Sequence, residues 1–447
     1  MVDFPVDVLF SPPRLSAISF GAVTRPPARA PAPDPAAVDE LLSLWKASSR
    51  PAIITGTGAR GTGDLLLKLA EKSHTPVFYS TKYSNTIPHG HELRGGPAGL
   101  LAALPAIGKP QTDLIILLGA RTGFLLGGRS GTVIPNADCK VIQVDVDGAE
   151  IGKSHPIDLG IISDATRFLE ATLTQIDRDS DSPFKENGEW TQLASSLISF
   201  PSPHANDPKA QPDGRLHPYH AVQAVMRALP PDSIITVDGG EAGIWAQGAL
   251  EAAKPHIAMA ATGYLGFLGN GWGYALGSAV ADPSRLVVNI HGDGSAGFHI
   301  AELDTFARHG LRILTVVVNN YAWGMSLAGQ EIVYSLKTPA RMISKLSPSC
   351  RYDVVAQGFG CEGVMVTEYE KIGEAVRGLS EVGKGPGLLN LIVSETPITG
   401  VTRRMVDMTE DEDMIVVPYY DNVPRPYYRE KGSLDSNENA NRKVDGH

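Results

Sequence analysis

The sequence predicts an α/β protein with two Rossmann-like domains, each built on a parallel sheet. Short apolar runs of strand length alternate with helical stretches in two separate regions of the chain. Uninterrupted apolar runs of this kind are typical of parallel strands that are buried on both faces. The 447 residues also exceed what one ordinary core accommodates, and a polar, proline-rich stretch at 176–215 separates the two regions.

The amino-terminal segment is expected to lie outside the first sheet. Residues 1–35 start with a strand-like apolar run, Val6–Phe10, and continue into the proline-rich sequence RPPARAPAPDP. The proline-rich part has the composition of an extended linker. A single strand cannot bury a face by itself, so we expect this residual strand to dock on something else.

The first domain is predicted to span residues 36–175. Its strand-like runs are PAIITG, PVFYS, DLIILLGA, KVIQVDVD and LGIISD, and its helical stretches include AVDELLSLWKAS and LLLKLAEKS. This alternation is typical of a doubly wound sheet with helices on both faces. Residues 176–215 are polar around one short amphipathic helix, and we interpret them as the connection between the domains.

The second domain is predicted to span residues 216–400. It starts with the helical stretch AVQAVMRAL and contains the strand-like runs SIITVDGG, LVVNIHGDG, RILTVVVNN and LLNLIVSET. Residues 401–447 form a carboxyl-terminal extension. Its last part, GSLDSNENANRKVDGH, has almost nothing to bury and is predicted to be disordered.

Composition and charge exclude several classes of protein. The formal net charge of -10 and the isoelectric point near 5.7 argue against a nucleic-acid partner, which would normally need a basic face. The three cysteines show no CxxC spacing, so neither a disulfide framework nor a cysteine zinc site is indicated. No segment offers about 18 uninterrupted apolar residues or a secretory signal, which predicts a cytoplasmic protein without a membrane partner.

Two strand ends in the second domain carry polar residues that suit a metal ion. The sequence HGDGS, with Asp293 at its centre, follows one strand-like run, and Asn320 ends the next. A right-handed crossover makes these strands parallel, so the two side chains can converge on one hard cation such as Mg²⁺. The glycines beside Asp293 let backbone amides approach an anion, and a diphosphate would suit them. Either motif alone is more often a simple turn, but their combination favours a site.

The stretch GDGSAGFHIAELDTFARHGLRILTVVVNN resembles the signature of thiamine diphosphate enzymes, which begins at GDG and ends at NN. The resemblance extends over about 36–400 and is greatest to the group of benzaldehyde lyase, acetohydroxyacid synthase and 2-hydroxyacyl-CoA lyase. RGGPAGLL, LLGARTGFLLGGRSGTVIP, VIQVDVDGAEIG and NNYAWGM support it. It implies a middle domain at 36–175, a diphosphate-binding domain at 216–400, and the cofactors thiamine diphosphate and Mg²⁺.

The resemblance also implies roles for individual residues. Magnesium ligands would be Asp293, Asn320 and the backbone carbonyl of Ala322. Leu268, in GYLGFLGNGWGYALG, matches the apolar wedge that bends the cofactor in this family, although a plain core leucine is the alternative. The implied contacts with the cofactor are Gly240, Glu241, Gly266, Phe267, Leu268, Gly294, Ser295, Asn320, Ala322, Trp323 and Gly324.

The expected substrate pocket departs from the pattern of benzaldehyde lyase. Where that enzyme has a histidine before GYLG and a tyrosine after DGG, this sequence has Thr262 and Gly243. Both changes remove groups that handle protons, so the substrate and the reaction direction cannot be carried over. The expected pocket residues are Thr262, Trp323, Met325 and Leu327. For the last three, burial in the core is an equally good interpretation.

The chain shows no counterpart of the aminopyrimidine-binding domain that supplies the activating glutamate in the family. The opening DFPVDVLFSPP resembles the last strand and exit of such a domain. We therefore expect a heterodimer or heterotetramer in which a separate subunit supplies the glutamate. The expected activity is that of a lyase or carboligase on small aldehydes and 2-oxo acids. The alternatives are a non-catalytic scaffold or regulatory subunit, and a truncated form of an acetolactate synthase-like 2-oxo acid decarboxylase.

Two further motifs carry weaker predictions. Residues Gly56 to Gly61 after the run PAIIT fit GxGxxG, but no acid follows the next strand to hold a ribose. Some relatives bind FAD or ADP in this domain, so FAD is possible here but is not predicted.

The near histidine pair His217 and His220 is more typical of surface residues than of metal ligands.

Overall fold

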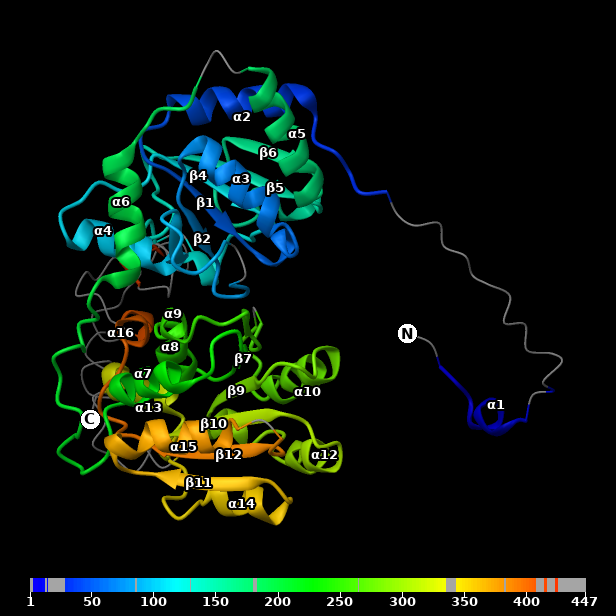
Figure 1. Cartoon of the computed structure of the whole chain (residues 1–447), viewed down its shortest axis with the longest axis vertical. Coiled ribbons are helices and arrows are strands. Elements are labelled where there is room, and N and C mark those ends of the chain that lie inside the picture. Colours follow the sequence, from blue (N-terminus) through cyan, green and yellow to red (C-terminus); the bar gives the residue numbers. More distant parts are fainter. Residues whose placement is uncertain are drawn as a thin grey trace, which may run out of the picture.

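The computed structural model describes two bodies, one above the other in Figure 1, each with a parallel six-stranded sheet. It describes residues 3–12, 14, 29–84, 87–128, 130–179, 183–263, 265–334, 343–381, 383–406, 414–415 and 423–424. Helices flank both sheets, so the predicted fold class is confirmed. The last part of the carboxyl-terminal extension, 432–447, lies outside the described residues. No described helix is both long and apolar enough to cross a membrane.

The amino-terminal segment forms a helix, α1 (Val6–Phe10), and the prediction of a strand there is wrong. It lies apart from both sheets (Figure 1), and none of its residues is buried. A strand needs a neighbour for its backbone hydrogen bonds, whereas a helical turn makes them internally. The amides of Val8 and Leu9 both donate to the carbonyl of Pro5, and Asp7 lies in the first turn, where the helix dipole favours an acid.

The first sheet has the strand order β3-β2-β1-β4-β5-β6. Its strands are β1 (Pro51–Thr55), β2 (Val77–Tyr79), β3 (Arg94–Pro97), β4 (Leu114–Leu118), β5 (Lys140–Asp145) and β6 (Leu159–Ile162). Its helices are α2 (Pro35–Ala47), α3 (Gly63–Ser73), α4 (Ala103–Ala106), α5 (Ala165–Arg178) and α6 (Gly188–Ser196). All residues of β1 and β4 are buried, as their uninterrupted apolar sequences predict.

Part of the stretch expected to connect the domains packs into the first one. Helix α5 continues to Arg178, and α6 contributes Trp190 and Ala194 to the core under the sheet. The indole of Trp190 is 5% exposed and donates to the carbonyl of Pro51 at 2.8 Å. The connection to the second domain is therefore shorter than the composition suggested.

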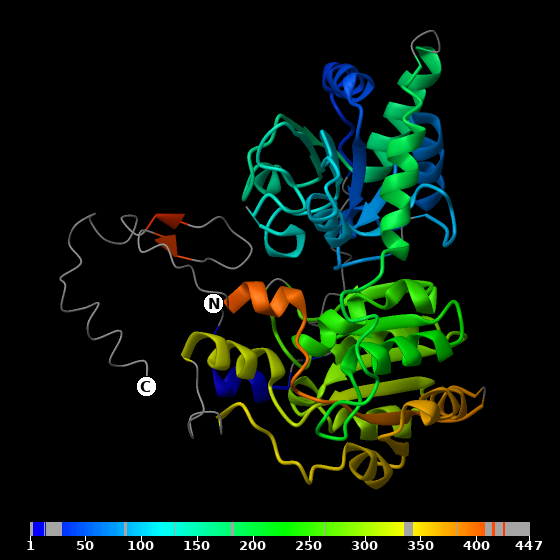
Figure 2. The same cartoon turned by 90° about the vertical axis from the view of Figure 1, so that its left-hand side faces the viewer.

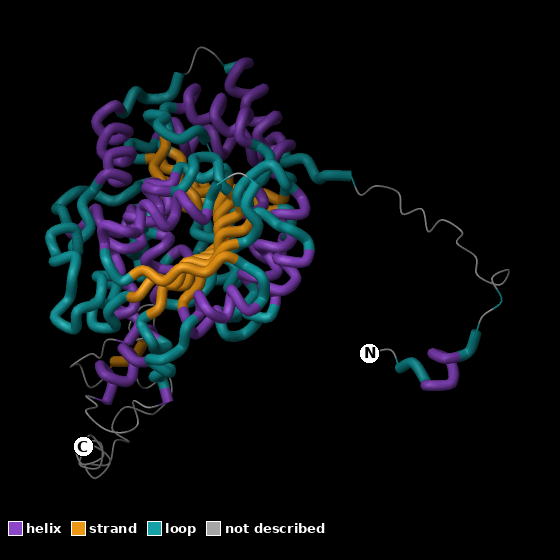
Figure 3. The backbone as a smooth tube through the Cα atoms, turned by 60° about the horizontal axis from the view of Figure 1, so that its bottom comes forward, coloured by secondary structure: helices purple, strands orange, loops and turns teal. Residues whose placement is uncertain are grey.

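The second sheet has the strand order β11-β12-β10-β9-β7-β8. Its strands are β7 (Ile234–Val237), β8 (Ile257–Ala260), β9 (Val287–Gly292), β10 (Ile313–Asn319), β11 (Glu362–Val366) and β12 (Gly387–Ile392). Its helices are α7 (Pro218–Ala228), α8 (Glu241–Gln247), α9 (Leu250–Ala253), α10 (Gly271–Ala281), α11 (Asp293–Ala296), α12 (Glu302–Arg308), α13 (Gly324–Tyr334), α14 (Tyr352–Gly358) and α15 (Ile372–Leu379). Figure 3 shows these strands between two layers of helices.

The carboxyl-terminal extension contributes α16 (Gly400–Val406) and a small hairpin of β13 (Met414–Ile415) and β14 (Val423–Pro424). Helix α16 packs against α13, on the side of the second domain that faces the first (Figure 2). It therefore lies close to the carboxyl ends of the second sheet's strands.

The two domains are joined by a partly buried ion pair and by backbone pairing. Arg94 at the start of β3 donates to both carboxylate oxygens of Glu251 in α9, at 3.0 and 2.9 Å, and Tyr79 donates to the same carboxylate at 2.8 Å. After β2, the chain runs alongside β8, where Ser84 and Ala258 exchange two hydrogen bonds. These contacts fix the domains relative to each other.

Candidate active site

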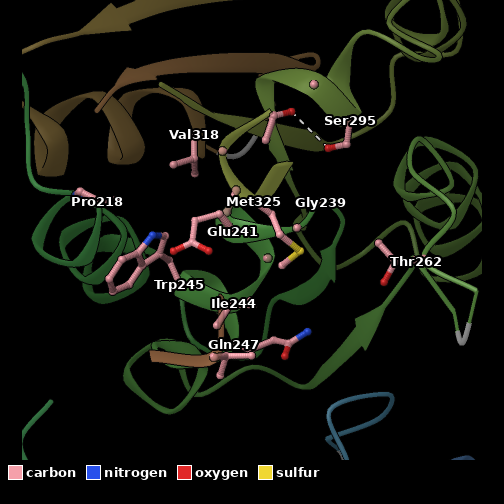
Figure 4. Close-up of a pocket in the computed structure, with 18 of the residues that line it drawn as sticks. Pro218, Gly239, Glu241, Ile244, Trp245, Gln247, Thr262, Ser295, Val318 and Met325 are labelled. Carbon is pink, nitrogen blue, oxygen red and sulfur yellow. Dashed lines mark hydrogen bonds between the residues drawn. The ribbon is translucent and has the colours of Figure 1, made fainter. Parts of the chain in front are cut away.

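A pocket of about 790 Å³ lies where the carboxyl ends of β7, β9 and β10 face the first domain. The loops that follow these strands line it with residues 239–243, 292–295 and 320–326, apart from 321. Strands β7 and β9 are neighbours, and β8 lies on the other side of β7, so the connections run in opposite directions from this point. Ligands of open parallel sheets bind at such switch points. Figure 4 shows several of these side chains around the pocket.

Asp293 and Asn320 converge, as the sequence predicts. The backbone amide of Ala322 donates to Asp293 Oδ2 at 3.0 Å and to Asn320 Oδ1 at 3.1 Å, so the two side-chain oxygens lie on the same side of one amide. Asp293 is 3% exposed, and burial raises the pKa of its carboxyl to about 7 although the amides of Gly294 and Ala322 lower it. A hard cation would offset that cost of burial, and the oxygen ligands fit Mg²⁺.

The glycines after β7 and β9 allow two backbone loops to approach each other closely. Gly239 has φ +110°, and a Cβ on it would lie 3.1 Å from the amide nitrogen of Gly292. A Cβ on Gly294 would lie 2.7 Å from the indole of Trp323. Between these loops, the hydroxyl of Ser295 donates to the carbonyl of Gly292 at 3.1 Å and lies 3.1 Å from His291 Nδ1. Backbone amides and one hydroxyl thus line this end of the pocket, which fits a diphosphate.

Glu241 lines the pocket, but its carboxylate is engaged elsewhere. It accepts hydrogen bonds from the amide of Thr399 and the hydroxyl of Thr402, at the start of α16. Figure 4 shows its side chain directed toward Trp245. Burial raises the pKa of Glu241, while the hydrogen bonds from Thr402 and Thr399 lower it. The carboxylate therefore anchors α16 to α8, and the expected contact of Glu241 with the cofactor stays a prediction.

The loop at 261–270, which we call the wedge loop, follows β8 and precedes α10. Leu268 is half-buried and lines the pocket, as expected of a wedge, and Gly266 with φ +69° lines it as well. Phe267 is 60% exposed and does not line the pocket in this chain, so its expected contact with the cofactor stays a prediction. Successive side chains in such a loop point in different directions, so a matching motif does not place all of them.

The expected substrate residues divide into two groups. Thr262, Trp323 and Met325 line the pocket. Leu327, in α13, is 2% exposed and lies outside the lining, so it belongs to the packing of the helix, and the prediction that it walls the pocket is corrected. The pocket is also lined by residues from the first domain, α8 and α16 to which the sequence analysis assigned no role. These include Thr81, Leu125, Thr132, Val133, Gln247 and Val401.

The GxGxxG motif of the first domain has a packing role. A Cβ on Gly56 would lie 2.3 Å from the carbonyl oxygen of Gly119, and one on Gly58 would lie 2.8 Å from the Cα of Gly119. The amide of Gly58 donates to that carbonyl at 3.0 Å. These glycines therefore let the loops after β1 and β4 pack against each other. This favours the interpretation that the motif is structural, and FAD stays a possibility that is not predicted.

The histidines before α7 form a hydrogen-bonded cluster. Asp207 accepts from His204 Nδ1 at 2.8 Å and lies 3.2 Å from His217 Nε2. The amide of Tyr219 donates to His217 Nδ1 at 3.1 Å, so the ring hydrogen of neutral His217 is on Nε2 and points to Asp207. A metal at Nε2 would break this helix cap. His217 is 1% exposed, so the prediction of a surface histidine is wrong for this residue.

Comparisons with known proteins agree with this geometry. The family model described as "Thiamine pyrophosphate enzyme, central domain" matches residues 38–172, and the model described as "Thiamine pyrophosphate enzyme, C-terminal TPP binding domain" matches residues 238–391. The chain belongs to the thiamine pyrophosphate enzymes. Thiamine pyrophosphate is another name for thiamine diphosphate, so the pocket lies in a domain of the type that binds this cofactor.

Relatives of this thiamine pyrophosphate enzyme chain include the acetolactate synthase large subunit of Corynebacterium glutamicum, 28% identical over 408 residues. That match covers 88% of this chain and 62% of the relative. Sulfoacetaldehyde acetyltransferase of Rhodobacter capsulatus is 28% identical over 371 residues, covering 78% of this chain and 61% of that protein. The chain thus spans less than two thirds of the length of these relatives.

A solved structure shows the same fold. The crystal structure of benzoylformate decarboxylase from Polynucleobacter necessarius superposes with a TM-score of 0.66 at 20% sequence identity. The similarity covers 86% of this chain and 68% of that one. Most of this chain therefore shares its fold with that structure.

Proposed function

We propose that this chain is the diphosphate- and magnesium-binding subunit of a heteromeric thiamine diphosphate-dependent carboligase or lyase. The observation that carries the proposal is the convergence of Asp293 and Asn320 on the amide of Ala322 at the mouth of the glycine loops. A separate subunit supplies the glutamate that activates the cofactor. The reaction is acyloin formation, or C–C cleavage of 2-hydroxy ketones or 2-oxo acids.

Asp293, Asn320 and the backbone carbonyl of Ala322 would hold Mg²⁺, and Mg²⁺ would hold the diphosphate. Asp293 is buried and already oriented by two amide hydrogen bonds, from Gly294 and Ala322. Preoriented ligands lose little freedom when the cation binds. Gly240, Gly294, Ser295 and Gly324 line the same end of the pocket and would contact the phosphate oxygens.

Leu268 would support the bent form of the cofactor from the wedge loop, because it projects into the pocket from the half-buried part of that loop. When bound, thiamine diphosphate supplies the electron sink for making or breaking a carbon–carbon bond next to a carbonyl. The chain's own contribution is to orient the diphosphate, to exclude water with its apolar wall, and to hold α16 over the pocket through Glu241.

The partner subunit is supported by two features of the pocket. Among the described residues that line it, the acids are Asp293, which is placed to bind the metal, and Glu241, which anchors α16. The activating glutamate would therefore come from another chain. In addition, large apolar side chains around the wedge loop and the glycine loop are 42–80% exposed: Leu265, Phe267, Phe298 and Trp323. Such a patch beside a pocket is typical of a surface that another protein covers.

Small carbonyl compounds are the proposed substrates. Relatives include acetolactate synthases and sulfoacetaldehyde acetyltransferase, which by name act on small carbonyl compounds. Beyond the glycine loops, the pocket is walled by apolar side chains such as Ile244, Met325 and Val401, with the hydroxyl of Thr262 and the amide of Gln247 as polar groups. Aldehydes and 2-oxo acids are the classes to assay first.

Cofactor binding tests the first half of the proposal. Thiamine diphosphate is titrated into the purified chain with Mg²⁺ and with EDTA, and binding is followed by quenching of tryptophan fluorescence, since Trp323 and Trp245 line the pocket. We expect saturable binding that needs Mg²⁺. Binding that is equal in EDTA would contradict the metal site, and an absence of binding would contradict the proposal as a whole.

Turnover tests the second half. The chain is copurified from its native source, and aldehydes and 2-oxo acids are assayed with the isolated chain and with the copurified partner. We expect turnover only with the partner. Turnover by the isolated chain would refute the need for a partner. Cofactor binding without turnover in any complex would favour the scaffold alternative.

A further inference from the structure

The chain segment that leaves β2 of the first domain covers the free edge of the second sheet. Tyr83 forms an antiparallel bridge with Met259 of β8. The amide of Ser84 donates to the carbonyl of Ala258 at 3.1 Å, and the amide of Ala258 donates to the hydroxyl of Ser84 at 2.9 Å. An edge strand has unpaired backbone groups, and this segment satisfies part of them on β8.

Lys82 in the same segment contacts the elements on either side of the wedge loop. Its Nζ donates to the carbonyl of Ala260, the last residue of β8, at 2.9 Å. The same Nζ lies 5.7 Å from the ring centre of Tyr274 in α10, the helix that follows the loop. Within the loop, a Cβ on Gly263 would lie 3.9 Å from Nζ. One ammonium group thus links the strand before the loop to the helix after it, and lies beside Gly263 of the loop.

The wedge loop needs such support because its own backbone is permissive. Gly263, Gly266 and Gly269 have φ values of +65°, +69° and +92°. Glycines at such positions adopt many conformations in the absence of other constraints, so fixing them costs conformational entropy. The amide of Phe267 donates to the carbonyl of Thr262 at 2.9 Å and closes the loop on itself. The start of the loop is held to the sheet by the amide of Ala261, which donates to the carbonyl of Val237 in β7 at 2.8 Å, and its end by His299 Nδ1, 3.2 Å from the carbonyl of Gly269. Lys82 adds a link between Ala260 before the loop and Tyr274 after it.

We propose that Lys82 is a positioning residue for the wedge loop, by which the first domain sets the placement of Leu268 in the cofactor pocket. The proposal rests on the proposed function in one respect, the role of Leu268. A hydrogen bond from an ammonium group is stronger than one between neutral groups, and the ammonium group also interacts with the face of the tyrosine ring. Both interactions would be lost with the charge.

The test compares three variants of the full chain. Lys82→Met keeps most of the side-chain length and removes the charge and the donors. Lys82→Arg keeps both and should restore the contacts. Lys72→Met is the matched control, because Lys72 lies in the same domain, in an exposed ion pair with Asp177. Hydrogen–deuterium exchange of residues 261–270 is measured without cofactor, and the dissociation constant of Mg²⁺–thiamine diphosphate is measured by fluorescence.

For Lys82→Met we expect several-fold faster exchange in residues 261–270, unchanged exchange in β9 and β10, and a dissociation constant raised about tenfold, equivalent to about 1.4 kcal/mol. Lys82→Arg should lie near the wild type, and Lys72→Met should match it. Wild-type exchange in Lys82→Met would overturn the proposal. If the wild-type chain bound no cofactor, the proposed function would fail, while the exchange result would still decide whether Lys82 positions the loop.

Discussion

The two sheets have the same number of strands and only parallel pairing, but their switch points differ in what the loops do. In the first sheet, the loops after β1 and β4 pack against each other, with Gly58 bonded to Gly119. In the second sheet, the loops after β7 and β9 leave a pocket that contains Asp293 and Ser295. Glycine-rich turns at equivalent places thus serve packing in one domain and ligand access in the other.

This difference shows that a glycine motif at a strand end is not enough to make a site. Side chains with ligand atoms must come from neighbouring strand ends, as Asp293 and Asn320 do. In the first domain, Asp145 at the end of β5 instead accepts the amide of Asp147 within its own turn. Substitutions at the two switch points should therefore differ in effect: those in the second domain should weaken ligand binding, and those in the first should lower stability.

The largest effect is expected for Asp293→Ala. Loss of a direct metal ligand should weaken Mg²⁺-dependent thiamine diphosphate binding by more than about 100-fold, since even changes to residues behind the ligands cost about 10- to 100-fold. Binding is measured by fluorescence titration at several Mg²⁺ concentrations. The matched control is Asp145→Ala, the same change at a strand end of the first sheet. Unchanged binding in Asp293→Ala would show that the metal site lies elsewhere.

The next effect is expected for Gly56→Ala. The new Cβ would lie 2.3 Å from the carbonyl oxygen of Gly119, which is backbone and cannot rotate away. We expect the free energy of unfolding to fall by about 3 kcal/mol. The folded fraction should still bind the cofactor as the wild type does. Denaturant unfolding is the measurement, with Gly188→Ala as control because nothing lies within 4 Å of its Cβ position. A loss of binding without a loss of stability would instead indicate a ligand role for the motif.

The smallest effect is expected for Glu251→Gln, where the domains meet. Burial alone would raise the pKa of this carboxyl, but the hydrogen bonds from His89 and Arg94 and the charge of Arg94 lower it from 4.5 to about 2. That difference corresponds to about 3 kcal/mol. Because a fifth of the side chain is exposed, we expect the variant to lose about 2 kcal/mol at pH 7.

The pH dependence of that loss follows from the sign of the shift. The folded-state pKa lies below the unfolded value, so the stabilisation is complete above about pH 4.5 and disappears as the pH falls toward 2. Unfolding of Glu251→Gln and wild type is compared from pH 7 to pH 3.5, with Glu170→Gln, from an exposed pair with Arg167, as control. A difference between wild type and Glu251→Gln that stays constant below pH 4.5 would exclude this ion pair as its source.

Local sequence patterns were sufficient for much of the fold and for the centre of the site. The runs LIILL and ILTVVV are buried strands because nearly every residue in them is apolar and can be covered on both faces. Patterns were less reliable where a segment lacks neighbours: VDVLF has a strand-like composition, but with no adjacent strand it makes its backbone hydrogen bonds as a helix. Likewise, Trp190 gave no local sign that its helix belongs to the first core.

The sequence by itself determined that Asp293 and Asn320 meet, because strand ends and a right-handed crossover are local properties of the chain. Only the tertiary structure decided which neighbours share the site. Glu241 is directed to α16 by Thr399 and Thr402, more than 150 residues away. Lys82 reaches β8 from the other domain. Such contacts depend on how the two domains pack, and no periodicity or motif in the sequence predicts that packing.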